Sequence, residues 1–318
     1  MKPKPLVLVL TGPTAVGKTA LSLPLAERLG GEILSCDARQ IYRQLTIGTA
    51  KPEPEERARV PHHFIDERDV DEPYSAGQYE REALERIGQV LERGRVPIVV
   101  GGSTLYLHAL LHGLDVLPPA DPETRSELLR RAQREGWGAL YEELKRVDPQ
   151  AARSLDPTKT QRLIRALEVY HLTGEPISRF YGGPRSRPFR FLALVLTRDR
   201  AHLYRRINER ALQMFARGLV EEVRGLLKRG YSPELNALRT TGYAELFPYL
   251  RGEYSLERAI YLVQRNTRRY AKRQYTWFRR DALLKTWLDL DSLEASGQDP
   301  VDWVCGWWEA QQRVFAER

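Results

Sequence analysis

The sequence predicts an α/β fold in which helices wrap a parallel sheet and a helical domain interrupts the sheet-forming parts. Short apolar runs alternate with helical patterns along the chain, as in parallel sheets with crossover helices. The first run leads directly into a glycine-rich loop at 12–19, and strand patterns are missing between 115 and 190. These three observations predict a core lobe and a helical insertion domain.

The four apolar runs that predict strands are 6–10, 32–35, 97–100 and 191–197. Charged helical patterns that follow Asp-Pro pairs fill the insertion. We therefore expect four segments: the first part of the core at 1–114, the insertion at 115–190, a return to the core with a basic helical segment at 191–285, and a helical tail at 286–318.

The composition is that of an ordinary globular protein. The 318 residues are 42% hydrophobic and 29% charged, which suffices for one large or two modest cores. No stretch approaches the roughly 18 apolar residues of a membrane span, and the first residues contain no cleavable apolar region. Cys36 and Cys305 are too few for a disulfide framework or a zinc site. We expect a cytoplasmic monomer that binds no membrane.

The loop after the first strand has the spacing of a phosphate-binding loop, Gly12-x-x-x-x-Gly17-Lys18-Thr19. Its glycines let backbone N–H groups approach an anion, Lys18 adds a positive charge, and the Thr19 hydroxyl can ligate Mg²⁺. This predicts a P-loop NTPase-like core that holds a diphosphate or triphosphate. The run at 97–100 ends in glycine rather than in the aspartate that many P-loop hydrolases use for Mg²⁺, which disfavours a hydrolytic motor.

Polar residues follow two other predicted strands. Asp37 follows the second strand and Ser103 follows two glycines after the third. Ligands of open parallel sheets lie beyond the carboxyl ends of the strands, so both side chains are expected near the phosphates. Asp37 can act as a general base or cap the turn before Ile41, and Ser103 can bind an anion or cap a helix. The pattern alone leaves these roles open.

A basic segment at 256–280 carries eight Arg or Lys residues and one acid, Glu257. Four aromatic residues, Tyr270, Tyr275, Trp277 and Phe278, lie among the cations. Cations can neutralise phosphates while aromatic rings stack on bases, which suits RNA. A solvated helix with its aromatic residues packed inward explains the composition equally well.

An ordered set of motifs along 6–280 resembles the tRNA dimethylallyltransferases. The motifs are Gly12-Pro-Thr-Ala-Val-Gly-Lys-Thr19, Ser35-Cys-Asp-Ala-Arg-Gln-Ile-Tyr42, Ile47-Gly-Thr-Ala-Lys-Pro52, Pro61-His-His-Phe-Ile-Asp66, Gly101-Gly-Ser-Thr-Leu-Tyr106, Gln161-Arg-Leu-Ile-Arg-Ala-Leu-Glu168, Thr241-Gly-Tyr243 and Lys272-Arg-Gln-Tyr-Thr-Trp-Phe-Arg279. The chain ends without the zinc-finger residues that eukaryotic relatives often append, so we expect a bacterial form.

The resemblance implies transfer of a dimethylallyl group from dimethylallyl diphosphate to tRNA, with release of diphosphate. The acceptor would be the exocyclic amine of the adenosine immediately 3′ of the anticodon, and Asp37 would be the general base. Lys18, Ser103, Arg210 and Mg²⁺ on Thr19 would stabilise the leaving group. The residues implied to hold the diphosphate, rather than ATP, are Gly12, Pro13, Thr14, Ala15, Val16, Gly17, Lys18, Thr19 and Arg210.

The resemblance also implies contacts with the anticodon stem-loop. The implied residues are Asp37, Ala38, Arg39, Gln40, Ser103, Arg125, Gln161, Arg162, Leu163, Ile164, Arg165, Leu238, Arg239, Thr240, Thr241, Gly242, Tyr243, Lys272, Arg273, Gln274, Tyr275, Thr276, Trp277, Phe278 and Arg279. Ala38 stands where most relatives have serine, and Ser103 where threonine is more usual.

Two other function classes remain open on the sequence alone. The chain can be a small-molecule kinase that uses ATP, with the helical insertion as a lid; consumption of ATP without RNA would indicate this. It can also be a non-catalytic RNA-binding switch, for which a nucleotide changes RNA affinity without turnover.

Overall fold

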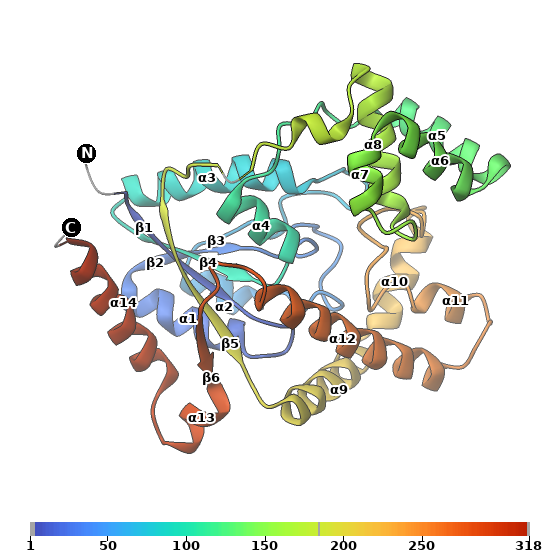
Figure 1. Ribbon diagram of the computed structural model, residues 1–318. Coiled ribbons are helices and arrows are strands. Elements are labelled where there is room, and N and C mark those ends of the chain that lie inside the picture. The colour runs from blue at the N-terminus through green and yellow to red at the C-terminus, as the bar shows by residue number, and fades with distance from the viewer. Residues whose placement is uncertain (1–3, 184, 317–318) are drawn as a thin grey trace. The chain divides into compact units, whose positions relative to one another are not determined.

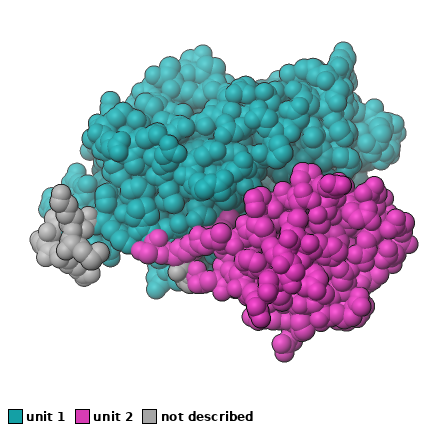
Figure 2. Space-filling view, turned by 90° about the horizontal axis from the view of Figure 1, so that it is seen from above, with its two compact units in different colours: residues 1–111, 187–318 teal, residues 112–186 magenta. Residues whose placement is uncertain are grey.

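The computed structural model describes residues 4–183 and 185–316. The chain forms two compact units, which are described separately (Figures 1 and 2). The core unit is drawn from 1–111 and 187–318, and the helical unit from 112–186.

A parallel sheet of six strands lies at the centre of the core unit, in the order β3-β2-β4-β1-β5-β6. The strands are β1 (Leu6–Thr11), β2 (Gly31–Ser35), β3 (His62–His63), β4 (Val96–Gly101), β5 (Arg190–Thr197) and β6 (Thr286–Asp289). The central strands are nearly continuous apolar runs because helices cover both faces of a parallel sheet. This architecture confirms the predicted α/β fold with a parallel sheet.

The helices of the core unit are labelled in Figure 1. They are α1 (Lys18–Leu29), α2 (Pro54–Arg59), α3 (Ala76–Glu92), α4 (Thr104–His112), α9 (Arg200–Ala216), α10 (Leu219–Lys228), α11 (Leu246–Leu250), α12 (Leu256–Phe278), α13 (Leu290–Ala295) and α14 (Pro300–Ala316).

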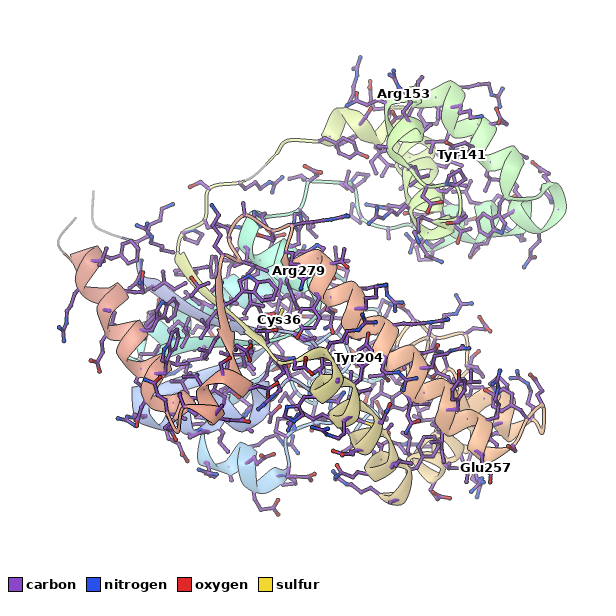
Figure 3. All side chains as sticks on the ribbon, turned by 60° about the horizontal axis from the view of Figure 1, so that its bottom comes forward. Cys36, Tyr141, Arg153, Tyr204, Glu257 and Arg279 are labelled. Carbon is purple, nitrogen blue, oxygen red and sulfur yellow. The ribbon has the colours of Figure 1, made fainter. Side chains whose placement is uncertain are left out.

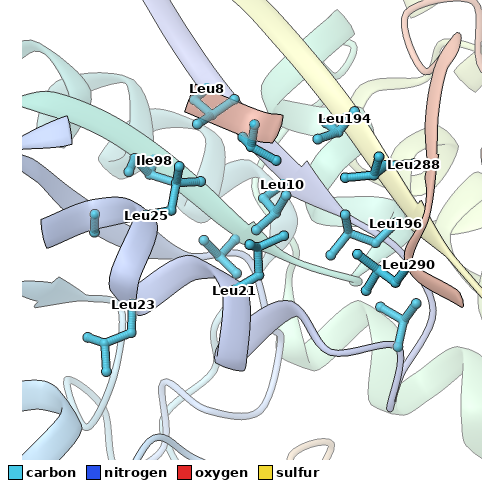
Figure 4. Close-up of a cluster of buried hydrophobic side chains, with 14 of the residues drawn as sticks. Leu8, Leu10, Leu21, Leu23, Leu25, Ile98, Leu194, Leu196, Leu288 and Leu290 are labelled. Atoms are coloured by element: carbon cyan, nitrogen blue, oxygen red, sulfur yellow. The ribbon is translucent and has the colours of Figure 1, made fainter. Parts of the chain in front are cut away.

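A buried apolar cluster joins α1 to the sheet and to the end of the chain (Figure 4). Leu10 of β1 and Leu196 of β5 pack with Leu21 of α1 and with Leu288 and Leu290. Each of these side chains is less than a tenth exposed. Such burial stabilises the folded state by roughly 1.5–3 kcal/mol for each large aliphatic side chain. The cluster therefore fixes the start of α1, where the phosphate loop ends.

The sequence analysis was wrong about the start of the C-terminal segment. It predicted a helical tail over 286–318, but residues 286–289 form β6, which pairs with β5 from Leu194 and Thr286 to Thr197 and Asp289. The helices α13 and α14 follow. A strand of four residues is too short to show a period of two, and the two residues of β3 were missed for the same reason.

The helical unit has its own core. Its elements are α5 (Pro122–Glu135), α6 (Trp137–Val147), α7 (Pro149–Ser154), α8 (Thr160–Thr173) and a 3₁₀ helix, η1 (Ile177–Phe180). Asp121 and Asp148 cap α5 and α7 by accepting hydrogen bonds from backbone N–H groups, each followed by a proline at the first helical position. Leu140 and Leu163 are completely buried in its core.

Along the described ranges, 4–183 and 185–316, no helix combines the length and the apolar character that a membrane crossing requires.

Candidate active site

The phosphate loop connects β1 to α1 at the carboxyl end of the sheet. Gly12 has a φ of 148°, and a Cβ at this position would lie 2.6 Å from the carbonyl oxygen of Leu196 on β5. Gly17 has a φ of 119° and immediately precedes α1. The two glycines are therefore required by the backbone conformation and, at Gly12, by the neighbouring strand.

Side chains from distant helices hold this loop. Gln274 of α12, which is buried, accepts a hydrogen bond from the Thr14 N–H at 2.9 Å and donates one to the Gly102 carbonyl oxygen at 2.7 Å. The Arg206 guanidinium of α9 donates to the Ala15 carbonyl oxygen at 2.9 Å. The loop is thus fixed by α9 and α12 as well as by its own turn.

A cavity of about 400 Å³ opens over the loop and the start of α1. The residues that line it are Thr14, Ala15, Gly17, Lys18, Thr19, Ala20, Asp37, Gln40, Thr49, Ala50, Arg206, Glu209, Arg210 and Gln213. Two of them, Ala15 and Ala50, have left-handed φ values of 66° and 49°, which alanine rarely adopts. Backbone strain of this kind concentrates at functional sites. We call the cavity over the phosphate loop the loop cavity.

The loop cavity is lined by three basic side chains, of which Lys18 and Arg210 are partly buried. Lys18 Nζ donates hydrogen bonds to the carbonyl oxygens of Gly12 and Pro13, both at 2.9 Å. Burial and, to a smaller extent, the neighbouring Arg210 together lower the pKa of Lys18 to about 7, and Asp37 opposes this shift. Burial also lowers the pKa of Arg210 to about 10. A cavity in which cations are destabilised by burial favours a polyanionic ligand that restores their charge.

The pKa of Lys18 predicts proton uptake on anion binding. Above pH 7 the Lys18 amine of the free protein is largely neutral, whereas a bound anion favours the ammonium and raises its pKa. Pyrophosphate binding at pH 8.5 should therefore take up as much as about one proton more in the native protein than in Lys18→Met. Affinity should fall as the pH rises above 7. Calorimetry in two buffers with different ionisation enthalpies measures this difference.

If the native protein and Lys18→Met took up the same number of protons, the lowered pKa of the Lys18 amine would be wrong. Because both proteins bind the same pyrophosphate, its own ionisation cancels in the comparison.

Asp37 follows β2, and the structure shows its capping role. Its Oδ1 accepts hydrogen bonds from the backbone N–H groups of Arg39 at 2.8 Å and Gln40 at 3.3 Å. No group in the described part of the chain donates to Oδ2. The carboxylate is therefore held in a fixed orientation by one oxygen, and the second oxygen can accept a proton from a ligand.

A second cavity, of about 360 Å³, shares part of its wall with the loop cavity. Residues common to both are Thr14, Asp37, Thr49 and Arg210. The other residues of the second cavity are Ala38, Arg39, Gly48, Ile207, Ala211, Met214, Arg239, Thr240, Thr241, Gly242, Val263, Thr267, Tyr270 and Arg273. The lining combines apolar side chains and the Tyr270 ring with four arginines, which suits a ligand with both a flat apolar part and phosphates. We call it the acceptor cavity.

The structure gathers several predicted residues at these cavities and leaves others away from them. Ser103 lines neither cavity; its N–H donates to the Cys36 carbonyl oxygen at 3.2 Å, just before α4 begins. Six other residues implied to contact RNA have buried side chains: Leu163, Ile164, Leu238, Tyr243, Gln274 and Phe278.

The helix α12 contains most of the basic segment, and its two ends lie near Glu257 and Arg279 (Figure 3). Its cations Lys272, Arg273 and Arg279 are exposed, whereas Gln274 and Phe278 are buried. Tyr275 stacks on Trp287, with ring centroids 6.2 Å apart. The exposed cations and the buried Phe278 match the interpretation as a solvated helix, and RNA binding by its exposed face stays a prediction.

In the helical unit, Gln161 and Arg162 at the start of α8 are exposed. Arg125 and Arg165 instead bind the completely buried Glu168, at 2.9 and 2.7 Å. These two arginines neutralise a carboxylate that would otherwise be costly to bury.

Sequence reasoning missed several lining residues. Arg206 precedes Arg210 by one helical turn and Gln213 follows it, so the helical period from Arg210 could have indicated them. Thr49 and Ala50 lie inside a motif that the sequence analysis quoted without assigning a role. Gln274 was expected to contact RNA, and no local pattern indicates that it binds the phosphate loop.

The loop that carries Thr49 is held by a carboxylate that the sequence did not single out. Glu222 Oε2 accepts hydrogen bonds from the N–H groups of Thr46 at 3.1 Å and Ile47 at 2.8 Å. Glu222 Oε1 accepts one from the Gly48 N–H at 3.3 Å and one from the Tyr243 hydroxyl at 2.6 Å. Burial and Glu222 raise the pKa of Tyr243 well above its usual value, so this hydroxyl stays a donor.

Glu222→Gln should destabilise this loop. Glutamine keeps one oxygen that accepts hydrogen bonds, but the NH2 group that replaces the other oxygen cannot accept them. The donors on that side lose their partner, at a cost of about 2 kcal/mol in the free energy of unfolding. Tyr243→Phe removes one donor and leaves the other contacts, and should cost about 1 kcal/mol. Urea unfolding measures both values. A loss from Glu222→Gln no larger than that from Tyr243→Phe would contradict the proposed support of the backbone N–H groups.

The chain is similar in sequence and in structure to known proteins. Residues 40–281 match the family described as IPP transferase. A tRNA dimethylallyltransferase of Salinibacter ruber is 55% identical over 86% of this chain and 85% of its own. The crystal structure of a tRNA isopentenylpyrophosphate transferase from Bacillus halodurans superposes with a TM-score of 0.70 at 38% identity, covering 98% of this chain and 99% of that one.

A third similar structure is described as a eukaryotic dimethylallyltransferase acting on tRNA. It has a TM-score of 0.76 and 30% identity, and it covers 90% of this chain and 74% of that chain. The resemblance that the motifs indicated is confirmed by these matches. The chain belongs to the IPP transferase family, with relatives named tRNA dimethylallyltransferase that match most of its length.

Proposed function

We propose that the chain transfers the dimethylallyl group of dimethylallyl diphosphate to the exocyclic amine of the adenosine immediately 3′ of the tRNA anticodon. Diphosphate is the second product. The relatives that match most of the chain carry the name of this activity, and the cavities supply the groups that it needs.

One observation supports this function above the others: the loop cavity and the acceptor cavity meet at Asp37 and Arg210. Transfer requires the donor carbon and the acceptor nitrogen to approach to near contact. A diphosphate in the loop cavity and a base in the acceptor cavity would place the bond that breaks and the bond that forms beside these two side chains.

The cations of the loop cavity would stabilise the leaving group. As the bond between the first donor carbon and oxygen breaks, negative charge develops on the diphosphate oxygens. Lys18 and Arg210 would compensate this charge, together with the N–H groups of the phosphate loop. We propose that Ser103 also contributes, since it follows Gly102, where a Cβ would lie 3.5 Å from Lys18 Nζ.

The residues of the loop cavity fit a Mg²⁺ ion. The Thr19 hydroxyl and the Asp37 carboxylate both line the cavity and offer oxygen ligands. Mg²⁺ commonly uses one or two protein oxygens, with phosphates and water completing its coordination. When bound, the ion would neutralise the charge of the diphosphate oxygens. We propose that Thr19 holds it.

Asp37 would orient the adenine amine and accept its proton as the new C–N bond forms. The lone pair of this amine is delocalised into the ring, so it is a poor nucleophile without a base. Oδ1 is held by two backbone N–H groups, which leaves Oδ2 for the amine. The adenine must leave its stack to reach the acceptor cavity, at a cost of a few kcal/mol that protein–RNA contacts must offset.

The tRNA anticodon stem-loop would bind through exposed cations and polar groups. We propose Arg39, Arg239 and Arg273 of the acceptor cavity as phosphate or base contacts, with Lys272 and Arg279 of α12 extending the basic surface. In the helical unit we propose Gln161 and Arg162. Both substrates are cytoplasmic and one chain carries every residue named, so we propose a monomer that acts in the cytoplasm.

Incubation with dimethylallyl diphosphate, Mg²⁺ and an unmodified tRNA with adenosine beside its anticodon tests the function. Nucleoside mass analysis should detect one dimethylallyl group added to that adenosine. An unchanged nucleoside profile, with protein that still binds pyrophosphate and tRNA, would contradict the proposal. Consumption of ATP without tRNA would favour the kinase instead.

A further inference from the structure

Arg198 contacts the backbone of the phosphate loop. It follows β5, its residue is 8% exposed, and it lines neither the loop cavity nor the acceptor cavity. Its Nε donates a hydrogen bond to the Val16 carbonyl oxygen at 2.9 Å. Val16 immediately precedes Gly17, which does line the loop cavity.

Two carboxylates of α13 fix the Arg198 guanidinium. Its Nη1 lies 2.5 Å from Asp291 Oδ1 and 2.9 Å from Glu294 Oε2, and its Nη2 lies 2.5 Å from Glu294 Oε1. Asp291 also accepts hydrogen bonds from the Asp199 N–H at 2.8 Å and, at its Oδ1, interacts with His202 Nδ1 at 2.7 Å. The guanidinium therefore has little freedom to leave the Val16 carbonyl.

The peptide between Val16 and Gly17 links this contact to the anion site. A trans peptide is planar, and its carbonyl and N–H point in opposite directions. Arg198 holds the carbonyl, so the Gly17 N–H is directed to the other side of the peptide. A Cβ at Gly17 would lie 3.5 Å from Leu290 Cδ1 and 3.8 Å from Arg198 Nη2, so α13 also supports the loop here.

We propose that Arg198, oriented by Asp291 and Glu294, is a positioning residue for diphosphate binding, and that β6 and α13 thereby complete the diphosphate site. The family match covers residues 40–281, so β6 and α13 lie outside it. The inference rests on the proposed function, since it takes the anion in the loop cavity to be the diphosphate of the donor.

Arg198→Lys tests the inference. The single ammonium group cannot bind the Val16 carbonyl and both carboxylates with the geometry of the guanidinium. The dissociation constant for inorganic pyrophosphate and the KM for dimethylallyl diphosphate should both rise roughly 10- to 100-fold, as for other residues that orient a binding group. The KM for tRNA should stay within about twofold, because its contacts are unchanged.

Arg187→Lys is the matched control. The Arg187 side chain is 10% exposed against 6% for Arg198, and it likewise binds a carboxylate, Glu80, and a carbonyl oxygen, that of Ala109. Both variants should lower the melting temperature, but only Arg198→Lys should weaken pyrophosphate binding. If Arg198→Lys does not fold, Asp291→Asn is measured in the same way, with the same expected direction.

Unchanged pyrophosphate affinity in the folded variant would overturn the inference, as would an equal loss in Arg187→Lys or an equal loss of tRNA affinity. Native protein that binds no pyrophosphate would contradict the proposed function itself, and the inference with it. If the native protein binds pyrophosphate, and only Arg198→Lys or Asp291→Asn weakens this binding, the result supports the inference and agrees with the proposed function.

Discussion

Asp37→Asn is expected to lower the rate of prenyl transfer by about 10²–10⁴-fold, the contribution of a general base. Asparagine keeps an oxygen that can accept the hydrogen bonds from Arg39 and Gln40, so the turn after β2 is preserved. It cannot accept the proton of the adenine amine. Single-turnover measurements with saturating tRNA and donor isolate this step, and tRNA affinity should change by no more than about threefold.

Asp299→Asn provides the control for loss of a capping carboxylate. Asp299 Oδ1 accepts hydrogen bonds from the N–H groups of Val301 at 2.6 Å and Asp302 at 3.1 Å, so it caps a turn with the same spacing as Asp37. It lies at the start of α14 and lines neither cavity. Its variant should transfer at the native rate. A near-native single-turnover rate for Asp37→Asn would show that the proton leaves by another route.

Arg210→Gln should have the second largest effect. Arg210 lines both cavities and donates to the Thr14 hydroxyl, so in the proposed reaction it would lie beside both the diphosphate and the reacting carbon. Glutamine can still donate a hydrogen bond but carries no charge. Because charge on the diphosphate grows in the transition state, kcat should fall by about 10²–10³-fold, with a smaller increase in the KM of the donor.

Arg205→Gln is the matched control, since Arg205 is exposed on the same helix, α9, and lines neither cavity. It should retain native kcat and KM. If Arg210→Gln instead raised only the KM of the donor and left kcat unchanged, Arg210 would bind the ground state and transition state equally, and its role in stabilising the leaving group would be wrong.

The central sheet could be predicted from the sequence because its strands are buried on both faces and read as continuous apolar runs. The phosphate loop was also predictable, since its glycines and Lys18 have a spacing that few other structures require. β3 and β6 could not be predicted, because two and four residues are too few to show a strand pattern. Their strand conformation comes from hydrogen bonds to β2 and β5.

The candidate site was predictable only where one element carries a local signal. Asp37 was indicated by its place after a strand, yet its two roles could not be separated until the orientation of each oxygen was known. Gln274 and Glu222 bind backbone groups of loops 260 and about 175 residues away. Backbone carbonyl and N–H groups look the same at every position, so no residue pattern identifies such partners.

Gln274 has a consequence for redesigning which RNA this protein accepts. Its amide bonds the loop that would hold the diphosphate, while cations on the outer face of the same helix, α12, point to solvent. Inserting or deleting one residue before position 274 would turn this side chain by about 100° around the helix axis and break the bond to Thr14. Engineers can therefore exchange the outer side chains freely, but length changes in α12 would alter substrate preference and donor capture together.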